Sequence, residues 1–143
     1  MVGIDISLAH FLRTGLLAEI AIGHERARVE AILGRPDDSG GRGSAFAIER
    51  YAGGKIEISF RKERAVLIAV YVVRGSDRAS GDRLVDDLGA ERTDSVGAFK
   101  KWYDAERIDY CVRLDDGDSC ILAVQRGASA VFHGGTLDSL QSS

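Results

Sequence analysis

The stretch from Ile22 to Asp38 has the alternation of apolar and polar positions typical of an amphipathic helix, with both ends marked. Gly23 is an acceptable N-cap, and Glu25 lies in the first turn, where a carboxylate interacts favourably with the helix dipole. Gly34 supplies a left-handed C-cap, and Pro36 prevents the helix from resuming. The apolar stripe of this helix contains Val29, Ile32 and Leu33. Because the opposite face is polar, the pattern predicts a helix that lies on the elements that follow.

A shorter helix is predicted before this one. Asp5 or Ser7 can cap it, and Gly15 ends it. Its apolar face contains Leu8, Phe11 and Leu12. The first half of the chain therefore begins with two helices.

Three strands are predicted after the second helix. The glycine-rich stretch 37–44 is expected to be a flexible loop, because its glycines lead out of a helix, unlike those of a phosphate-binding loop. Gly53 and Gly54 form a two-residue hairpin signal between the first two strands. Alternation marks the second strand at Ile56, Ile58 and Phe60. The run from Ala65 to Val73 is apolar on both faces, which is typical of a central strand.

The second half has a similar order of elements. Leu84, Val85 and Leu88 predict a short helix, and Asp94 and Ser95 can cap a second one. The apolar stripe of that second helix contains Val96, Phe99 and Tyr103. Three strands are predicted from Tyr110 to Leu114, Ser119 to Gln125 and Ala130 to His133, and the tail from Gly134 to Ser143 is expected to be loosely held.

These patterns predict an α+β fold, with an antiparallel sheet of about six strands and helices packed on one face. A length of 143 residues suits one domain spanning 1–143. The order helix, helix, three strands occurs twice, so a tandem duplication into pseudo-repeats 1–75 and 76–143 is a further interpretation.

Composition narrows the class of protein. With 45% hydrophobic and 29% charged residues, the chain is expected to be neither disordered nor membrane-spanning. The N-terminal stretch has charged residues among its apolar ones and no basic leader, so we expect a cytoplasmic protein. Two cysteines, Cys111 and Cys120, are too few for a disulfide scaffold and are expected to be reduced.

Charge is unevenly distributed between the halves. Residues 1–75 contain 11 basic and 9 acidic residues, for a net charge of +2, whereas residues 76–143 contain 8 and 13, for −5. The acidic charge of the second half argues against nucleic acid as a partner of that half, and it favours either a basic protein partner or simply solubility.

The segment from Ile22 to Asp38, followed by strands, resembles the SmpA/OmlA family of outer-membrane-assembly lipoproteins. The residues that carry this resemblance are Gly23, Val29, Leu33, Gly34, Pro36 and Asp37. The tandem helix-helix-strands unit is similar to the beta-lactamase inhibitor protein family, and small cytoplasmic immunity proteins of polymorphic toxins can share this pattern. The resemblance covers about half of the chain. It implies a fold more than a function, because Gly34 and Pro36 only end the helix. The membrane role of the lipoproteins is not implied, because their lipidated cysteine is absent.

No catalytic or metal-binding pattern is evident. His10, His24 and His133 are isolated from one another in the sequence, and their spacing relative to the cysteines matches no known set of metal ligands. The acidic run from Asp115 to Asp118 is better explained as a hairpin turn than as a calcium loop. We therefore expect a protein that is not an enzyme and that needs no cofactor or metal.

The predicted function is that of a non-catalytic cytoplasmic protein-binding module, most concretely an immunity or inhibitor-like protein that occludes a basic toxin or enzyme. The candidate partner-binding residues are Asp86, Asp87, Trp102, Asp115, Asp116 and Asp118. Trp102 lies near the edge of a core stripe, so packing in the core is the alternative for it. Two other functions stay open: a small-ligand-binding or catalytic domain with a cavity between sheet and helices, and a subunit of a stable oligomer.

Overall fold

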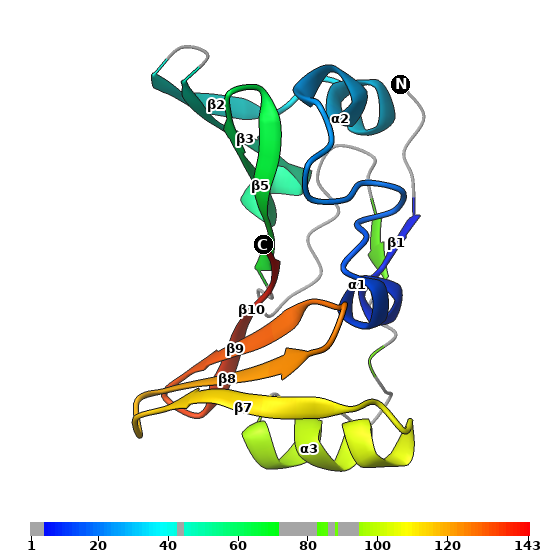
Figure 1. The fold of residues 1–143 in the computed structure, drawn as a ribbon, viewed down its shortest axis with the longest axis vertical. Helices are drawn as coiled ribbons and strands as arrows, with labels where there is room; N and C mark the ends of the chain where they lie inside the picture. The colour runs from blue at the N-terminus through cyan, green and yellow to red at the C-terminus, as the bar shows by residue number, and fades with distance from the viewer. Residues whose placement is uncertain (1–4, 43–44, 72–82, 86–87, 89–94) are drawn as a thin grey trace.

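A computed structural model describes residues 5–42, 45–71, 83–85, 88 and 95–143. Its main element is one antiparallel sheet of eight strands in the order β2-β3-β4-β5-β10-β9-β8-β7 (Figure 1). The strands are β2 (Asp38–Arg42), β3 (Phe46–Tyr51), β4 (Ile56–Arg61), β5 (Arg64–Tyr71), β7 (Tyr110–Asp115), β8 (Ser119–Val124), β9 (Ser129–His133) and β10 (Thr136–Ser142). The prediction of about six strands with helices packed on one face is therefore wrong.

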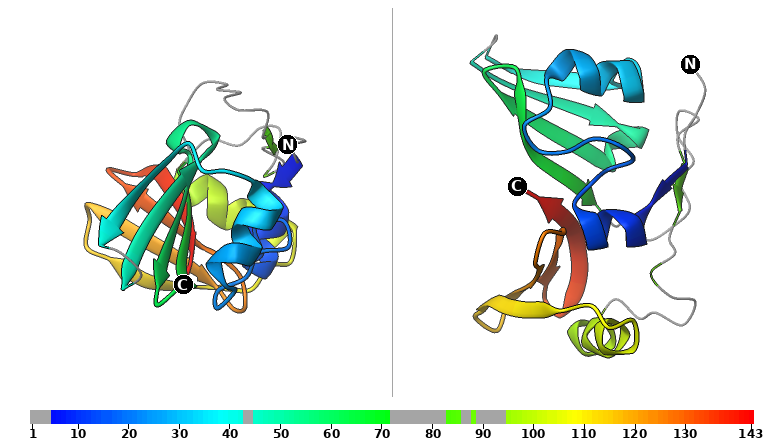
Figure 2. Two further views of the ribbon diagram at one scale, coloured as in Figure 1. Left: turned by 90° about the horizontal axis from the view of Figure 1, so that it is seen from above. Right: turned by 45° about the vertical axis from the view of Figure 1, so that its right-hand side comes forward.

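Three α-helices are present in the described part of the chain: α1 (Leu8–Thr14), α2 (Arg26–Leu33) and α3 (Val96–Ala105). Figures 1 and 2 show α2 beside the half of the sheet that contains β2 to β5, and α3 beside the half that contains β7 to β9. A separate pair of short parallel strands joins β1 (Asp5–Ser7) to β6 (Arg83–Val85). β6 corrects the helix predicted around Leu84 and Val85.

The repeating order of elements is a helix followed by four antiparallel strands, and not two helices followed by three strands. In the first half α2 precedes β2 to β5, and in the second half α3 precedes β7 to β10. The N-cap residue of each helix makes an isolated bridge to the first residue of the last strand of its own half: Glu25 with Arg64, and Ser95 with Thr136. The two halves then join through those last strands, β5 and β10.

β10 occupies the stretch that was expected to be a loosely held tail. It pairs with β5 on one side and β9 on the other, and Leu137, Ser139 and Leu140 are buried. Leu137 and Leu140 are three residues apart, which is not the spacing of a strand. A β-bulge between Leu137 and Ser139 adds one residue to the strand and brings both leucines into the core, so the simple alternation is lost.

β2 was likewise expected to be a loop, because its sequence is polar and rich in glycine. It is an edge strand that pairs along its length with β3. Gly41 has φ +115°, and a Cβ atom there would lie 2.4 Å from the carbonyl oxygen of Phe46. The two strands approach this closely only because position 41 has no side chain.

The helix ends agree with the sequence signals in most cases. Ser7 and Ser95 cap α1 and α3 by accepting hydrogen bonds from the N–H groups of His10 and Ala98, as predicted. Helix α2 is shorter than predicted, because it begins at Arg26 with Glu25 as N-cap. The stretch at Gly53 and Gly54 is a turn of 3-10 helix, η1 (Ala52–Gly54), between β3 and β4.

One hydrophobic core connects the helices to both halves of the sheet. Val29 and Leu33 of α2 are buried, and Ile32 is half-buried beside them. Phe99 of α3 meets Phe132 of β9 edge to face, with 5.2 Å between ring centroids. Helix α1 contacts the β8–β9 turn, where a Cβ at Gly127 would lie 2.2 Å from the carbonyl oxygen of Leu12, so that a glycine is needed there.

Truncation of Leu140 tests the central position of β10. Replacing this buried side chain by alanine should cost about 2 to 5 kcal/mol of unfolding free energy, because a cavity is left between β5 and β9. Asp138→Ala is the matched control in the same strand, since Asp138 is exposed, and should change stability by less than about 0.5 kcal/mol. Denaturation in urea measures both, and equal small effects would contradict the buried position of β10.

Candidate functional site

Three of the predicted acidic residues lie together at the tip of the β7–β8 hairpin. Asp115, Asp116 and Asp118 are all exposed. Asp116 Oδ1 accepts hydrogen bonds from the N–H groups of Asp118 (3.1 Å) and Ser119 (2.8 Å). The Asp116 side chain thus shapes the turn, and the three exposed carboxylates place negative charge at its end. Asp86 and Asp87 lie outside the described residues.

Trp102 lies on α3, away from that hairpin tip in the sequence, and is half-buried. Its ring packs edge to face on Phe99, with centroids 6.4 Å apart, and lies 5.6 Å from the ring of Tyr103. These contacts place Trp102 at the margin of the hydrophobic core, with part of its surface exposed.

The three histidines do not come together. The backbone N–H of His10 donates to Ser7, His24 Nδ1 accepts from the N–H of Ala21, and His133 Nδ1 lies 2.9 Å from Ser119 Oγ. Within the described residues, no group of three or more histidine, cysteine, aspartate or glutamate side chains has the arrangement of a metal site.

The two cysteines are free and differ in exposure. Cys111 on β7 is exposed, whereas Cys120 on β8 is buried, and this burial raises the pKa of the Cys120 thiol. The register of β7 against β8, which shifts at a β-bulge between Val112 and Leu114, does not pair the two cysteines. Cys111 pairs with Ala123, and Cys120 pairs with Asp115.

β7 forms one edge of the eight-stranded sheet and has no strand on its outer side among the described residues. Val112 and Leu114 are 46% and 41% exposed, the highest values among the large apolar side chains that the structure describes. Phe46 and Val66, in the first half, are the next most exposed at 37% each. An edge strand with exposed apolar side chains is a place where another chain can add a strand.

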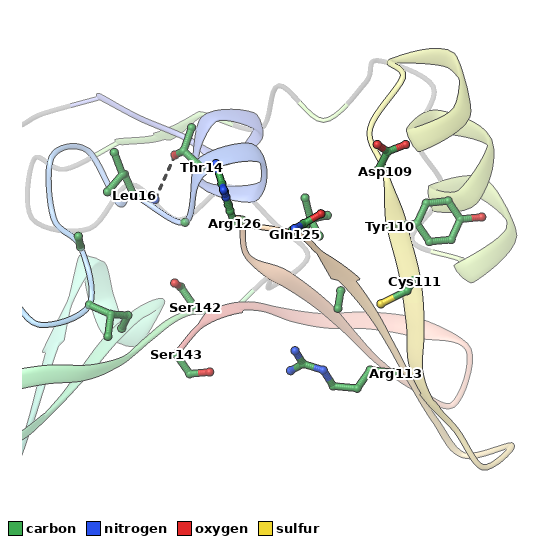
Figure 3. Close-up of a pocket in the computed structure, with 16 residues that line it drawn as sticks. Thr14, Leu16, Asp109, Tyr110, Cys111, Arg113, Gln125, Arg126, Ser142 and Ser143 are labelled. Carbon is green, nitrogen blue, oxygen red and sulfur yellow. Dashed lines mark hydrogen bonds between the residues drawn. The ribbon is translucent and has the colours of Figure 1, made fainter.

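A pocket of about 720 Å³ lies between β7, the C-terminal end of β10 and the end of α1 (Figure 3). Cys111 and Arg113 extend from β7 towards the end of β10, whereas the ring of Tyr110 points away towards α3. Arg126, from the β8–β9 turn, lies on the side near Thr14. Apolar side chains complete the wall: Leu16, Ala21, Ile22, Ala123 and Val124.

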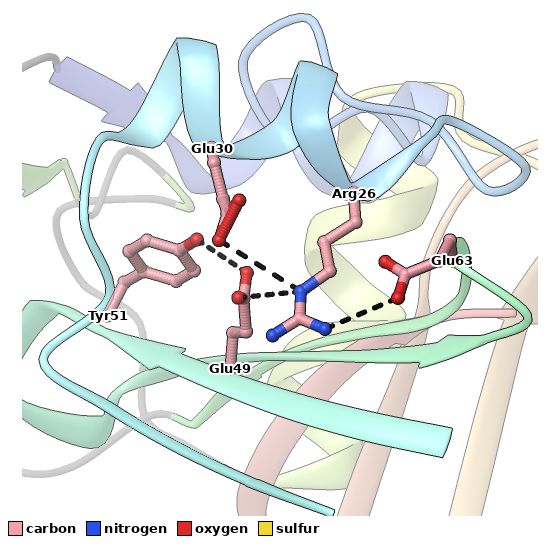
Figure 4. Close-up of polar contacts among 5 residues, drawn as sticks. All are labelled: Arg26, Glu30, Glu49, Tyr51 and Glu63. Atoms are coloured by element: carbon pink, nitrogen blue, oxygen red, sulfur yellow. Dashed lines mark hydrogen bonds and ion pairs between the residues drawn. The ribbon is translucent and has the colours of Figure 1, made fainter. Parts of the chain in front are cut away.

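A charged network lies between α2 and the sheet (Figure 4). Glu49 of β3 is 1% exposed, and its carboxylate accepts hydrogen bonds from Arg26 Nε at 3.0 Å and from the hydroxyl of Tyr51 at 2.9 Å. Arg26 also forms ion pairs with Glu30 and Glu63 at 4.0 Å and 3.6 Å, and its guanidinium lies over the ring of Phe60. A buried carboxylate needs such partners, because removing it from water is costly.

The network contains more negative than positive charge, and this changes proton affinities. Desolvation and a hydrogen bond with Glu49 raise the pKa of Glu30. Desolvation and the charge of Glu49 raise the pKa of the Tyr51 hydroxyl. Tyr51 therefore stays a neutral donor, and the network connects α2 to the sheet beneath it.

No family model, curated protein or solved structure matches this chain. In the described part of the chain, none of the helices has the length and apolar character needed to cross a bilayer.

Sequence reasoning missed both the pocket and the network. The pocket is lined from α1, the loop before α2, β7, the β8–β9 turn and the end of β10, so no local motif marks it. The network could have been recognised in the sequence. Ala47, Glu49 and Tyr51 are every second residue of β3 and so lie on the same buried face, which places an acidic residue at a core position.

Removing the hydroxyl group should have opposite effects on stability at two buried tyrosines, Tyr51 and Tyr103. Tyr51→Phe should destabilise the fold by about 1 to 3 kcal/mol, because Glu49 loses a hydrogen-bond donor. Tyr103 is fully buried and its hydroxyl has no hydrogen-bond partner among the described residues, so Tyr103→Phe should be neutral or slightly stabilising. Urea denaturation of the two variants provides the comparison, and a loss for Tyr103→Phe as large as that for Tyr51→Phe would contradict these positions.

The raised pKa of Glu30 predicts a dependence of stability on pH. The folded chain holds this proton more tightly than the unfolded chain, so the group stabilises the fold below its ordinary pKa and loses that contribution as the pH rises through the raised value. Glu30→Gln should therefore gain stability relative to wild type as the pH rises above the ordinary glutamate pKa of about 4. Glu19→Gln, at an exposed site, should track wild type across this range. A constant difference between Glu30→Gln and wild type would mean that the Glu30 pKa is not raised.

Proposed function

We propose that this protein is a non-catalytic protein-binding module of the immunity or inhibitor type, and that it binds its partner through the outer edge of β7 and the adjacent hairpin tip. The observation that carries the proposal is the exposed edge strand, which presents Val112 and Leu114. Natural proteins usually cover such an edge or give it charged side chains, since it can pair with other chains. In the part of the chain that the structure describes, no element pairs with the outer side of β7, so a partner that adds a strand could bind there.

The apolar surface continues inward from the edge. Leu114, Ile121 and Val131 are consecutive cross-strand partners on β7, β8 and β9, so they form one row across the sheet. Ile121 and Val131 are half-buried. The row gives a partner apolar contact area in addition to backbone hydrogen bonds from the edge, the combination used when an extended segment adds to a sheet.

Charge supports a basic partner. Asp115, Asp116 and Asp118 lie exposed at the end of the same strand, and residues 76–143 have a net charge of −5. Complementary charge accelerates encounter and is screened by salt. A basic toxin or enzyme with an extended segment fits this surface.

The test compares the edge with a matched apolar site elsewhere. The double variant Val112→Lys and Leu114→Lys places charge on the β7 edge, and Val66→Lys makes the same change on an exposed residue of β5. Proteins co-purified from the native cells are quantified by mass spectrometry, and a partner should be at least about tenfold depleted with the edge variant and retained with Val66→Lys. Its binding should also weaken as salt increases.

Two results would contradict the proposal. One is a specific partner that the edge variant binds as well as wild type. The other is a concentration-dependent dimer of the wild-type chain that the edge variant abolishes, which would assign β7 to contact between copies of this protein. Thermal unfolding of both lysine variants checks that they remain folded.

A further inference from the structure

The pocket beside β7 has features of a small-molecule site that the proposed protein-binding function does not use. Its volume of about 720 Å³ lies within the range of ligand sites in proteins. It is also held in place by backbone contacts: Ala128 N–H donates to the carbonyl oxygen of Leu12, which fixes the β8–β9 turn against α1. The close approach at Gly127 tightens the same contact.

The side chains that line the pocket carry a net charge of +1, from Arg113 and Arg126 against Asp109. Arg113 and Arg126 both line it, and neither forms an ion pair with any residue that the structure describes. Asp109 is the one acidic side chain among the described lining residues.

We propose that this pocket binds a small organic carboxylate, with Arg113 as the main contact to the carboxylate group and Arg126 adding positive charge at the side near α1. A planar guanidinium can hold a carboxylate with two parallel hydrogen bonds. The apolar wall, which includes Leu16, Ile22 and Val124, suits an apolar body attached to the carboxylate. Inorganic anions lack that body, and neutral molecules of the same shape lack the charge.

Cys111 provides a reporter inside the site. Its thiol is exposed and lines the pocket, whereas Cys120 is buried. Alkylation of Cys111 by iodoacetamide, a neutral reagent, should therefore slow when the pocket is occupied. Mass spectrometry of the peptides separates the two cysteines, and Cys120 should stay unmodified while the protein is folded.

The experiment measures the rate of Cys111 alkylation in the presence of benzoate, benzamide or inorganic phosphate. Benzoate should slow alkylation at least about threefold at saturation, whereas benzamide and phosphate should leave the rate unchanged. Arg113→Gln should weaken the protection by benzoate about tenfold, because the carboxylate loses its charged hydrogen-bond donors. Arg61→Gln, an exposed arginine on β4 that does not line the pocket, should retain full protection.

Each variant is compared with itself, with and without the probe, so an altered intrinsic rate of Cys111 does not affect the result. Equal protection by benzoate and benzamide, or none by either, would overturn the proposal. Protection by phosphate equal to that by benzoate would also overturn it, since the apolar wall would then contribute nothing. Loss of the β7 partner in the lysine variants has no bearing on these rates, so the two proposals fail separately.

Discussion

The antiparallel pairing of β5 with β10 is the interaction on which the rest of the structure depends. It joins two units that each consist of a helix and four strands, and it places Val70 opposite Leu140 inside the core. Without this pairing both strands would be edges, with unpaired backbone groups beside apolar side chains. The outermost strands of the sheet are β2 and β7, so the same pairing determines which two strands lie at its edges.

Sequence patterns predicted the fold where an element keeps a regular period and a clear cap. The caps at Ser7 and Ser95 and the alternation along β4 are of this kind. The patterns failed at irregularities that only pairing can reveal. The bulge beside Asp138 removes the regular alternation of apolar residues along β10, so this central strand was not recognised. The glycines of β2, which allow its backbone to approach β3 closely at Gly41, were interpreted as a loop. The number of strands, and with it the fold class, was wrong for these two reasons.

Prediction of the candidate site was more limited, for a different physical reason. The acidic hairpin tip could be found in the sequence because its residues are consecutive. Glu49 could have been identified as a buried acid from its place between Ala47 and Tyr51 on β3. Arg113 and Arg126 share a pocket only because α1 contacts the β8–β9 turn and β7 is bulged, and these are tertiary features without a local pattern.

The central place of β10 also has a consequence for synthesis on the ribosome. β5 ends at Tyr71, and its partner β10 begins at Thr136, so 64 residues lie between the two. At the usual pace of translation this interval is on the order of 3 to 13 seconds, during which the apolar strand β5 has no partner on one side. The nascent chain thus exposes an aggregation-prone strand for much longer than a hairpin takes to form. A chaperone that covers β5 during that interval would favour its correct pairing with β10.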